Sequence, residues 1–265
     1  MKSFGVIVIC TRRDYLFAKG CCASVRYFMG DTPICLLIDG EFDYSELVRT
    51  YNCSVITRDT IKNEELKRRS FGWGTTRFIA FWESPFDQFL LIDSDTVVWG
   101  DMRVYADKLN TYHIILDQPC YTYKEEDISH WFFKTDIIHK LYPDFNYLPH
   151  PYVCPGILMA NKNLFTHEEY MEILDLVDRN PGLFFPGDMG FINFMIYHLK
   201  EQGKLKVANE DIQYLVCDFK PEDMKKTFPC ENGKPVLTKA PTVQHYTGGI
   251  KPDRKSTRLN SSHRT

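Results

Sequence analysis

The sequence lacks long hydrophobic segments, paired-cysteine motifs and a large net charge. None of its apolar runs approaches the roughly 18 residues that cross a membrane, and the run at residues 4–10 is too short for a signal peptide. The nine cysteines form no CxxC pair, which is typical of a reduced, cytoplasmic protein rather than a disulfide-stapled one. A net charge of −3 without a basic stripe argues against a nucleic-acid partner. We therefore expect a cytoplasmic protein without a membrane span.

Aromatic residues, in contrast, are plentiful. The 265 residues include 19 Phe, 15 Tyr and 4 Trp, and 44% of the chain is apolar, which excludes disorder and allows a large core. Residues 255–265, KSTRLNSSHRT, are polar and aperiodic, and we interpret them as a non-native tail in place of the natural C-terminus. We expect one domain over residues 1–254.

Short apolar runs alternate with helical patterns in the first half of the chain. We expect helices at residues 15–28, after Asp43 as a cap, and at 75–83, and strands at residues 6–9, 34–38, 54–56 and 89–92. This alternation indicates parallel strands buried on both faces, with ligands beyond their carboxyl ends. Further along, Thr166 and Glu169 predict a capping box, and another helix is expected at residues 189–199.

The strongest local signal is Asp93-Ser94-Asp95, directly after the most apolar strand. If that strand continues, alternation puts both carboxylates on one side, where they reach the same divalent cation. The alternative is that the two aspartates form a turn or a cap. Their position at the end of a buried strand favours the metal site.

The segment from His245 to Pro252 carries a second signal. An imidazole would complete a metal shell and favour Mn²⁺ over Mg²⁺. Gly248 lets backbone N–H groups approach an anion, and Lys251 offers a point charge to phosphate. The alternative is a structural histidine.

Four further charged or aromatic positions are candidates, and three of them have two interpretations each. Asp188, after Gly187, either caps a helix or carries a functional carboxylate, and Arg77 is either a phosphate ligand or a solvated or paired side chain. Asp117 ends another apolar run. Tyr15 follows Thr11 after the first strand, where it either stacks on a planar ligand or belongs to the core.

Taken in order, these segments resemble glycosyltransferase family 8, which includes glycogenin and bacterial galactosyl- and glucosyltransferases. The resemblance spans residues 4–252 and rests on residues 6–11, 75–77, 93–96, 155–161, 187–190 and 245–252. It implies a single GT-A-type, Rossmann-like α/β domain with a mixed, mostly parallel sheet flanked by helices. The nucleotide-binding half would cover about residues 1–110 and the acceptor half about 111–254.

The resemblance also implies an activity, namely metal-dependent transfer of a sugar, usually from a UDP-sugar and with retention, to a carbohydrate, glycan or other hydroxyl acceptor. Asp93, Asp95 and His245 would ligate Mn²⁺ or Mg²⁺, and Asp117 and Asp188 would be the catalytic carboxylates. The donor-binding residues would be Thr11, Tyr15, Arg77, Asp93, Ser94, Asp95, Gly187, Gly248 and Lys251. A homodimer is left open.

The chain departs from the family pattern at Cys154-Pro155-Gly156, where an Asn usually stands two residues before the Gly, and at Asp253, where an aromatic residue is common. Residues 121–152 are rich in aromatics, including Trp131, Phe132 and Phe133, and suit either stacking on acceptor sugars or a lid or subunit interface.

Two other functions fit parts of the sequence. Asp93 and Asp95 match the nucleophile and the acid/base of a Mg²⁺-dependent haloacid-dehalogenase-like phosphatase, although that motif normally opens the fold. A sugar-nucleotide-binding protein without turnover is the third reading.

Overall fold

The structure, a computed structural model, describes residues 2–72, 74–119, 122–184 and 188–247. Its centre is a seven-stranded sheet with the order β3-β2-β1-β4-β7-β6-β8. These strands are β1 (Phe4–Thr11), β2 (Ile34–Asp39), β3 (Cys53–Ile56), β4 (Gln88–Asp93), β6 (Ile114–Asp117), β7 (Ile157–Asn161) and β8 (Val207–Glu210). β1, β2, β3 and β4 pair in parallel, β7 runs antiparallel to β4 and β6, and β8 is parallel to β6. The sheet is therefore mixed and mostly parallel, as predicted.

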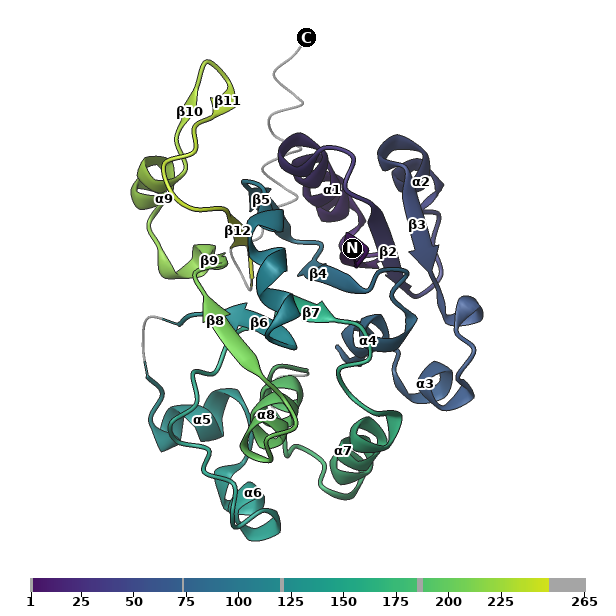
Figure 1. Cartoon of the computed structure of the whole chain (residues 1–265), viewed down its shortest axis with the longest axis vertical. Helices are drawn as coiled ribbons and strands as arrows, with labels where there is room; N and C mark the ends of the chain where they lie inside the picture. Colours follow the sequence, from purple (N-terminus) through teal and green to yellow (C-terminus); the bar gives the residue numbers. More distant parts are fainter. Residues whose placement is uncertain (1, 73, 120–121, 185–187, 248–265) are drawn as a thin grey trace.

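Both faces of this sheet are buried. Along β4, Leu90 and Ile92 face one hydrophobic core, whereas Phe89 and Leu91 face the other, because successive side chains of a strand point to opposite faces. Figure 1 shows α1 and α2 on one side of the strands and α5 to α8 on the other. The described helices are α1 (Tyr15–Met29), α2 (Ser45–Tyr51), α3 (Glu64–Arg69), α4 (Ala80–Glu83), α5 (Glu125–Trp131), α6 (Thr135–Leu141), α7 (His167–Arg179), α8 (Asp188–Glu201) and α9 (Pro221–Thr227), with the 3-10 segments η1 (Arg58–Thr60), η2 (Thr75–Ile79), η3 (Met102–Asn110) and η4 (Val216–Asp218).

A second, three-stranded sheet brings the end of the described chain back to β4. Its order is β5-β12-β9, formed by β5 (Thr96–Trp99), β12 (Thr242–His245) and β9 (Gln213–Leu215). β12 is antiparallel to β5 and parallel to β9. β10 (Cys230–Glu231) and β11 (Lys234–Pro235) form a separate short hairpin. Because β5 follows β4 after one turn, β12 ends next to the carboxyl end of β4.

Two local predictions need correction. Residues 75–83 form not one helix but η2 followed by the short α4, because the Thr75 hydroxyl donates to the Gly72 carbonyl at 2.8 Å and ties the start into a tight turn. The N-cap residue of α2 (Ser45–Tyr51) is Tyr44 and not Asp43; Asp43 stands one residue earlier, and its carboxylate accepts the N–H of Ser45, the first helical residue, at 2.9 Å.

The aromatic segment at residues 121–152 also differs from its prediction. Its described part contains α5 and α6, and Phe132 and Phe133 are 1% and 0% exposed within the core. These two rings are therefore unavailable for stacking on a sugar. Trp131, at 46% exposed, remains accessible.

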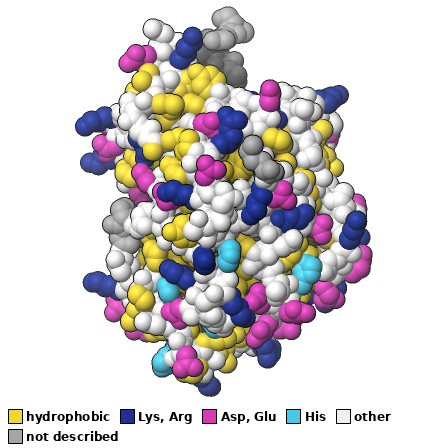
Figure 2. All heavy atoms as spheres, viewed as in Figure 1, with side chains coloured by type: hydrophobic (Ala, Val, Ile, Leu, Met, Phe, Trp, Pro, Cys, Tyr) yellow, Lys and Arg dark blue, Asp and Glu magenta, His cyan; other side chains and the backbone are white. Residues whose placement is uncertain are grey.

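The surface carries charge of both signs. Figure 2 shows basic and acidic side chains interspersed over the face in view, with apolar atoms between them. This face therefore presents no extended field of a single sign. Among the described residues, no helix has the length and apolar character needed to cross a bilayer.

Candidate metal centre and adjoining cavities

Asp93 and Asp95 lie at a tight turn at the carboxyl end of β4. The strand ends at Asp93, Ser94 and Asp95 form the turn, and β5 begins at Thr96, whose hydroxyl donates to the Asp93 carbonyl oxygen at 2.7 Å. Strand alternation was predicted to align the two carboxylates if the strand continued, but the strand ends at Asp93. The turn places them together instead.

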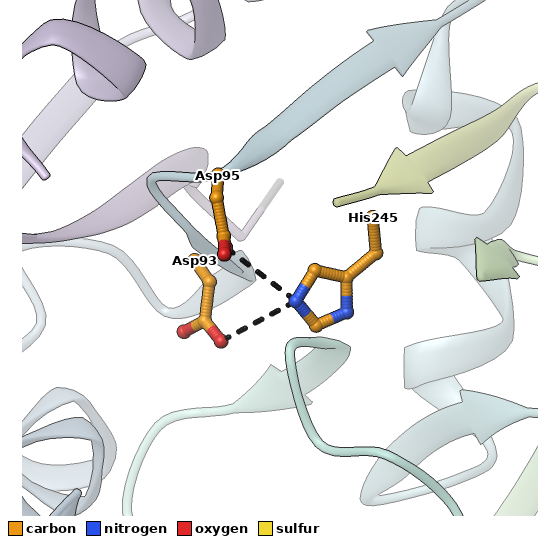
Figure 3. Close-up of side chains that lie close together, drawn as sticks. All are labelled: Asp93, Asp95 and His245. Atoms are coloured by element: carbon orange, nitrogen blue, oxygen red, sulfur yellow. Dashed lines mark ion pairs between the residues drawn. The ribbon is translucent and has the colours of Figure 1, made fainter. Parts of the chain in front are cut away.

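His245 approaches these carboxylates from the end of β12. It lies opposite Thr96 in the pairing with β5, and the next residue, Tyr246, donates its N–H to the Asp95 carbonyl at 2.9 Å. His245 Nε2 lies 3.5 Å from Asp95 Oδ1 and 3.8 Å from Asp93 Oδ2 (Figure 3). One ligand atom of each residue lies within 4.8 Å of the other two. The structure thus brings the three predicted metal ligands to one point.

The charges at this point favour a cation. Burial alone would lower the pKa of His245, but hydrogen bonds to Asp95 and Cys154 raise it to about 10, so that the protonated ring balances the carboxylates. A divalent ion in the same place would neutralise the carboxylate charges instead of the ring proton. Two carboxylate oxygens and one imidazole nitrogen form a donor set suited to Mn²⁺. The residues therefore fit a divalent metal.

Arg77 is a buried cation between two carboxylates. It is 6% exposed, and its Nη2 lies 3.2 and 3.3 Å from the two Asp93 carboxylate oxygens. Its Nε pairs with Asp188, and its Nη1 donates to the Pro155 carbonyl oxygen. Burial lowers the pKa of Arg77, but Asp188 and Asp93 outweigh it and hold the pKa above its usual range. Arg77 is therefore a paired, buried arginine and not a solvated one.

Asp188 is the first residue of α8, and its carboxylate lies against Arg77. Burial raises the pKa of Asp188, and the Arg77 charge opposes that effect. The close approach depends on Gly74, because a Cβ added there would lie 2.9 Å from Asp188 Cγ. Asp188 is thus coupled to Asp93 through a shared arginine.

A cavity of about 210 Å³ opens beside the cluster. Its described lining includes Thr11, Asp39, Arg77, Asp93, Ser94 and Asp95, so five predicted site residues meet there. Asp39, at the end of β2, also lines a larger cavity of about 430 Å³. The Asp39 carboxylate accepts the Thr76 hydroxyl at 2.7 Å and the Gly72 N–H at 3.0 Å, which fixes the wall that the two cavities share.

Asp117 contacts Gln213, whose side chain in turn contacts His245. At the end of β6 it lines a third cavity, of about 320 Å³, together with Tyr152 and the stacked rings of Tyr214 and Phe219, whose centroids are 3.8 Å apart. Its Oδ1 accepts the Gln213 N–H at 2.9 Å. Burial raises the pKa of Asp117 to about 6. Asp117 therefore connects to the metal cluster through Gln213.

Tyr15 points toward α2. Its hydroxyl donates to Glu46 at 2.9 Å, and its ring packs edge-on against Phe42, which lines the larger cavity. Gly187, Gly248 and Lys251 lie outside the described residues. Their predicted contacts with a donor stay predictions.

Two residues of the site were missed in the sequence. Asp39 ends a buried strand just as Asp93 does, so the rule that singled out Asp93 would have found it. Gln213 has no such signal. Its side chain is placed by the pairing of β9 with β12, which local sequence does not reveal.

Comparisons with known proteins agree with this geometry. No protein-family model and no curated protein matches the sequence. Among solved structures, the galactosyltransferase LgtC in complex with donor and acceptor sugar analogues superimposes with a TM-score of 0.63 at 15% identity, over 98% of this chain and 96% of LgtC. Mouse xyloside xylosyltransferase 1 gives 0.53 at 16% identity, over 94% and 99%. The glycosyltransferase GlyE of Streptococcus pneumoniae gives 0.57 at 16% identity, over 96% of this chain and 57% of GlyE.

The fold is therefore the GT-A-type fold of glycosyltransferases, and the predicted fold class is confirmed. Similarity at this identity defines the fold. The activity has to be argued from the site.

Proposed function

We propose that this protein is a metal-dependent glycosyltransferase of family 8 that transfers a sugar, with retention, from a UDP-sugar to an acceptor hydroxyl. The observation that carries the proposal is the convergence of Asp93, Asp95 and His245 within 4.8 Å, beside a cavity of a GT-A-type fold. The structures of similar fold named as galactosyl- and xylosyltransferases support this class of reaction.

Asp93, Asp95 and His245 would hold the metal, for which we propose Mn²⁺ because of the imidazole nitrogen. When bound, the ion supplies positive charge to the donor diphosphate and to the departing nucleotide. Arg77 contacts both Asp93 oxygens and also pairs with Asp188. It therefore fixes the positions of both carboxylates before any ligand arrives.

Two adjoining cavities are available for the two parts of the donor. Sites for ligands of this size are usually about 300–1,000 Å³, so the cavity of about 210 Å³ is too small for the whole molecule. We place the diphosphate and sugar there and the nucleoside in the adjoining cavity of about 430 Å³, where Phe42 offers an aromatic ring and Asp39 forms the shared wall.

The third cavity suits the acceptor. Tyr152, Tyr214 and Phe219 present aromatic surface of the kind that stacks on sugar rings. A carboxylate with a pKa of about 6 is poised to accept a hydroxyl proton near neutral pH, which is the role proposed for Asp117. Asp188, on the donor side, is the second proposed catalytic carboxylate.

The test measures release of nucleoside diphosphate from a panel of UDP- and GDP-sugars, with Mn²⁺ or with EDTA. Asp95→Ala is the site variant. Asp136→Ala is the control, because Asp136 is an exposed carboxylate in the first turn of α6. We expect Mn²⁺-dependent UDP release by the parent and by Asp136→Ala, and none by Asp95→Ala.

The other readings predict different results. Hydrolysis of a phosphate monoester without release of UDP would refute the transferase and support the phosphatase. Saturable donor binding by calorimetry, with no release in the presence of simple sugar or glycan acceptors, would support the binding protein.

A further inference from the structure

The two ring nitrogens of His245 have different surroundings. Nε2 faces Asp93 and Asp95, whereas Nδ1 lies 3.1 Å from Gln213 Oε1 and 3.8 Å from Cys154 Sγ. A histidine binds a metal through an unprotonated nitrogen, and the hydrogen bond at the other nitrogen decides which one that is. The group at Nδ1 therefore controls whether Nε2 is available to a metal.

Gln213 makes two hydrogen bonds besides its contact with His245. Its backbone N–H donates to Asp117 Oδ1 at 2.9 Å, and its Nε2 donates to the Cys154 carbonyl at 3.2 Å. Its side chain is 6% exposed, and β9 pairs directly with β12. The amide has little freedom to turn away from the ring.

The direction of the Gln213 amide follows from these contacts. The Cys154 carbonyl can only accept, so the NH₂ group of Gln213 must face it and Oε1 must face His245. Because Oε1 can only accept, Nδ1 must carry the proton. When the ring gives up one proton to bind a metal, the lone pair is therefore on Nε2, toward the two carboxylates.

We infer that Gln213 is a positioning residue for the metal centre, which sets the tautomer and the direction of His245 so that Nε2 points at the cation. This inference rests on the proposed function, since it needs a metal at Asp93, Asp95 and His245. Gln213 also connects Asp117, which lines the proposed acceptor cavity, with the metal ligand. Asp117 accepts the backbone N–H of Gln213, and the side chain of Gln213 contacts His245.

The experiment measures Mn²⁺ affinity directly, by the electron paramagnetic resonance signal of free Mn²⁺, without donor or turnover. Gln213→Met keeps the length of the side chain but removes the acceptor, whereas Gln213→Glu keeps an acceptor for the Nδ1 proton. Gln88→Leu is the control, because Gln88 is equally buried in β4 but bonds to Asn161 away from the site. Melting temperatures in EDTA confirm that each variant is folded.

We expect Gln213→Met to weaken Mn²⁺ binding by about 10–100-fold, as removal of such partners does at other metal sites. Gln213→Glu should recover most of the affinity, and Gln88→Leu should bind as the parent does. Parent-like binding by Gln213→Met, or equal loss in Gln213→Glu, would overturn the positioning role and leave the metal centre intact. If the parent and Asp95→Ala bind Mn²⁺ alike, the metal centre is refuted, and with it both proposals.

Discussion

An alanine at position 156 would place a methyl group inside the space of the His245 ring. A Cβ built on Gly156 lies 2.0 Å from His245 Cε1, 2.5 Å from Nδ1 and 2.7 Å from Nε2, whereas ordinary contact begins at 3.4 Å. The ring would have to retreat by about 1.4 Å. Gln213 Oε1 lies 3.1 Å from Nδ1, and His245 is only 3% exposed, so the surroundings leave little room for that movement.

Two effects of Gly156→Ala can be estimated. Overpacking of a buried position costs about 1–3 kcal/mol of unfolding free energy. Displacing His245 should also weaken Mn²⁺ binding by at least the roughly 10–100-fold that loss of an outer partner costs. Gly20→Ala is the matched control, because a Cβ at Gly20, within α1, meets nothing within 4 Å. That change should stabilise the protein by about 0.5–1 kcal/mol, since alanine is the better helix former.

Urea unfolding in EDTA measures the first effect, and Mn²⁺ titration of the folded variants measures the second. The reasoning is refuted if Gly156→Ala binds Mn²⁺ with the parent's affinity. It is also refuted if Gly20→Ala loses as much affinity, because the loss would then not arise from contact with His245.

Three further predictions follow from the buried charges. Arg77→Met should lower the unfolding free energy by about 3–5 kcal/mol because it leaves a buried carboxylate unpaired; adding Asp188→Asn should recover part of that loss in a urea double-mutant cycle, and strict additivity would contradict the pairing. Asp117 has a pKa of about 6 in the folded protein, so its native state holds a proton that the unfolded chain releases near pH 4. The contribution of Asp117 to stability should therefore fall by about 2 kcal/mol as pH rises from 4 to 6, and Asp117→Asn should flatten that slope in pH-dependent denaturation; an unchanged slope would contradict the assignment. Mn²⁺ at 100 times its dissociation constant should stabilise the parent by about 2.7 kcal/mol, seen as a higher melting temperature that Asp95→Asn abolishes; equal shifts would exclude Asp95 as a ligand.

Much of the architecture was predictable because its signals are local. The runs at β1, β2 and β4 are apolar on both faces, which is typical of strands covered by helices on two sides. The helix α7 was predicted from Thr166 and Glu169, and both hydrogen bonds of that capping box are present. Patterns of this kind depend on neighbours only a few residues away.

The sequence by itself therefore determined where buried strands end in carboxylates, at Asp93 and Asp117, and which residue types can bind a metal. Only the tertiary structure decided that Asp93, Asp95 and His245 meet. β12 inserts between β5 and β9, which brings His245 to Asp95 and Gln213 to His245. Strand pairing between segments so far apart in the sequence depends on how the whole chain buries its apolar faces. The periodicity of a short segment does not indicate it.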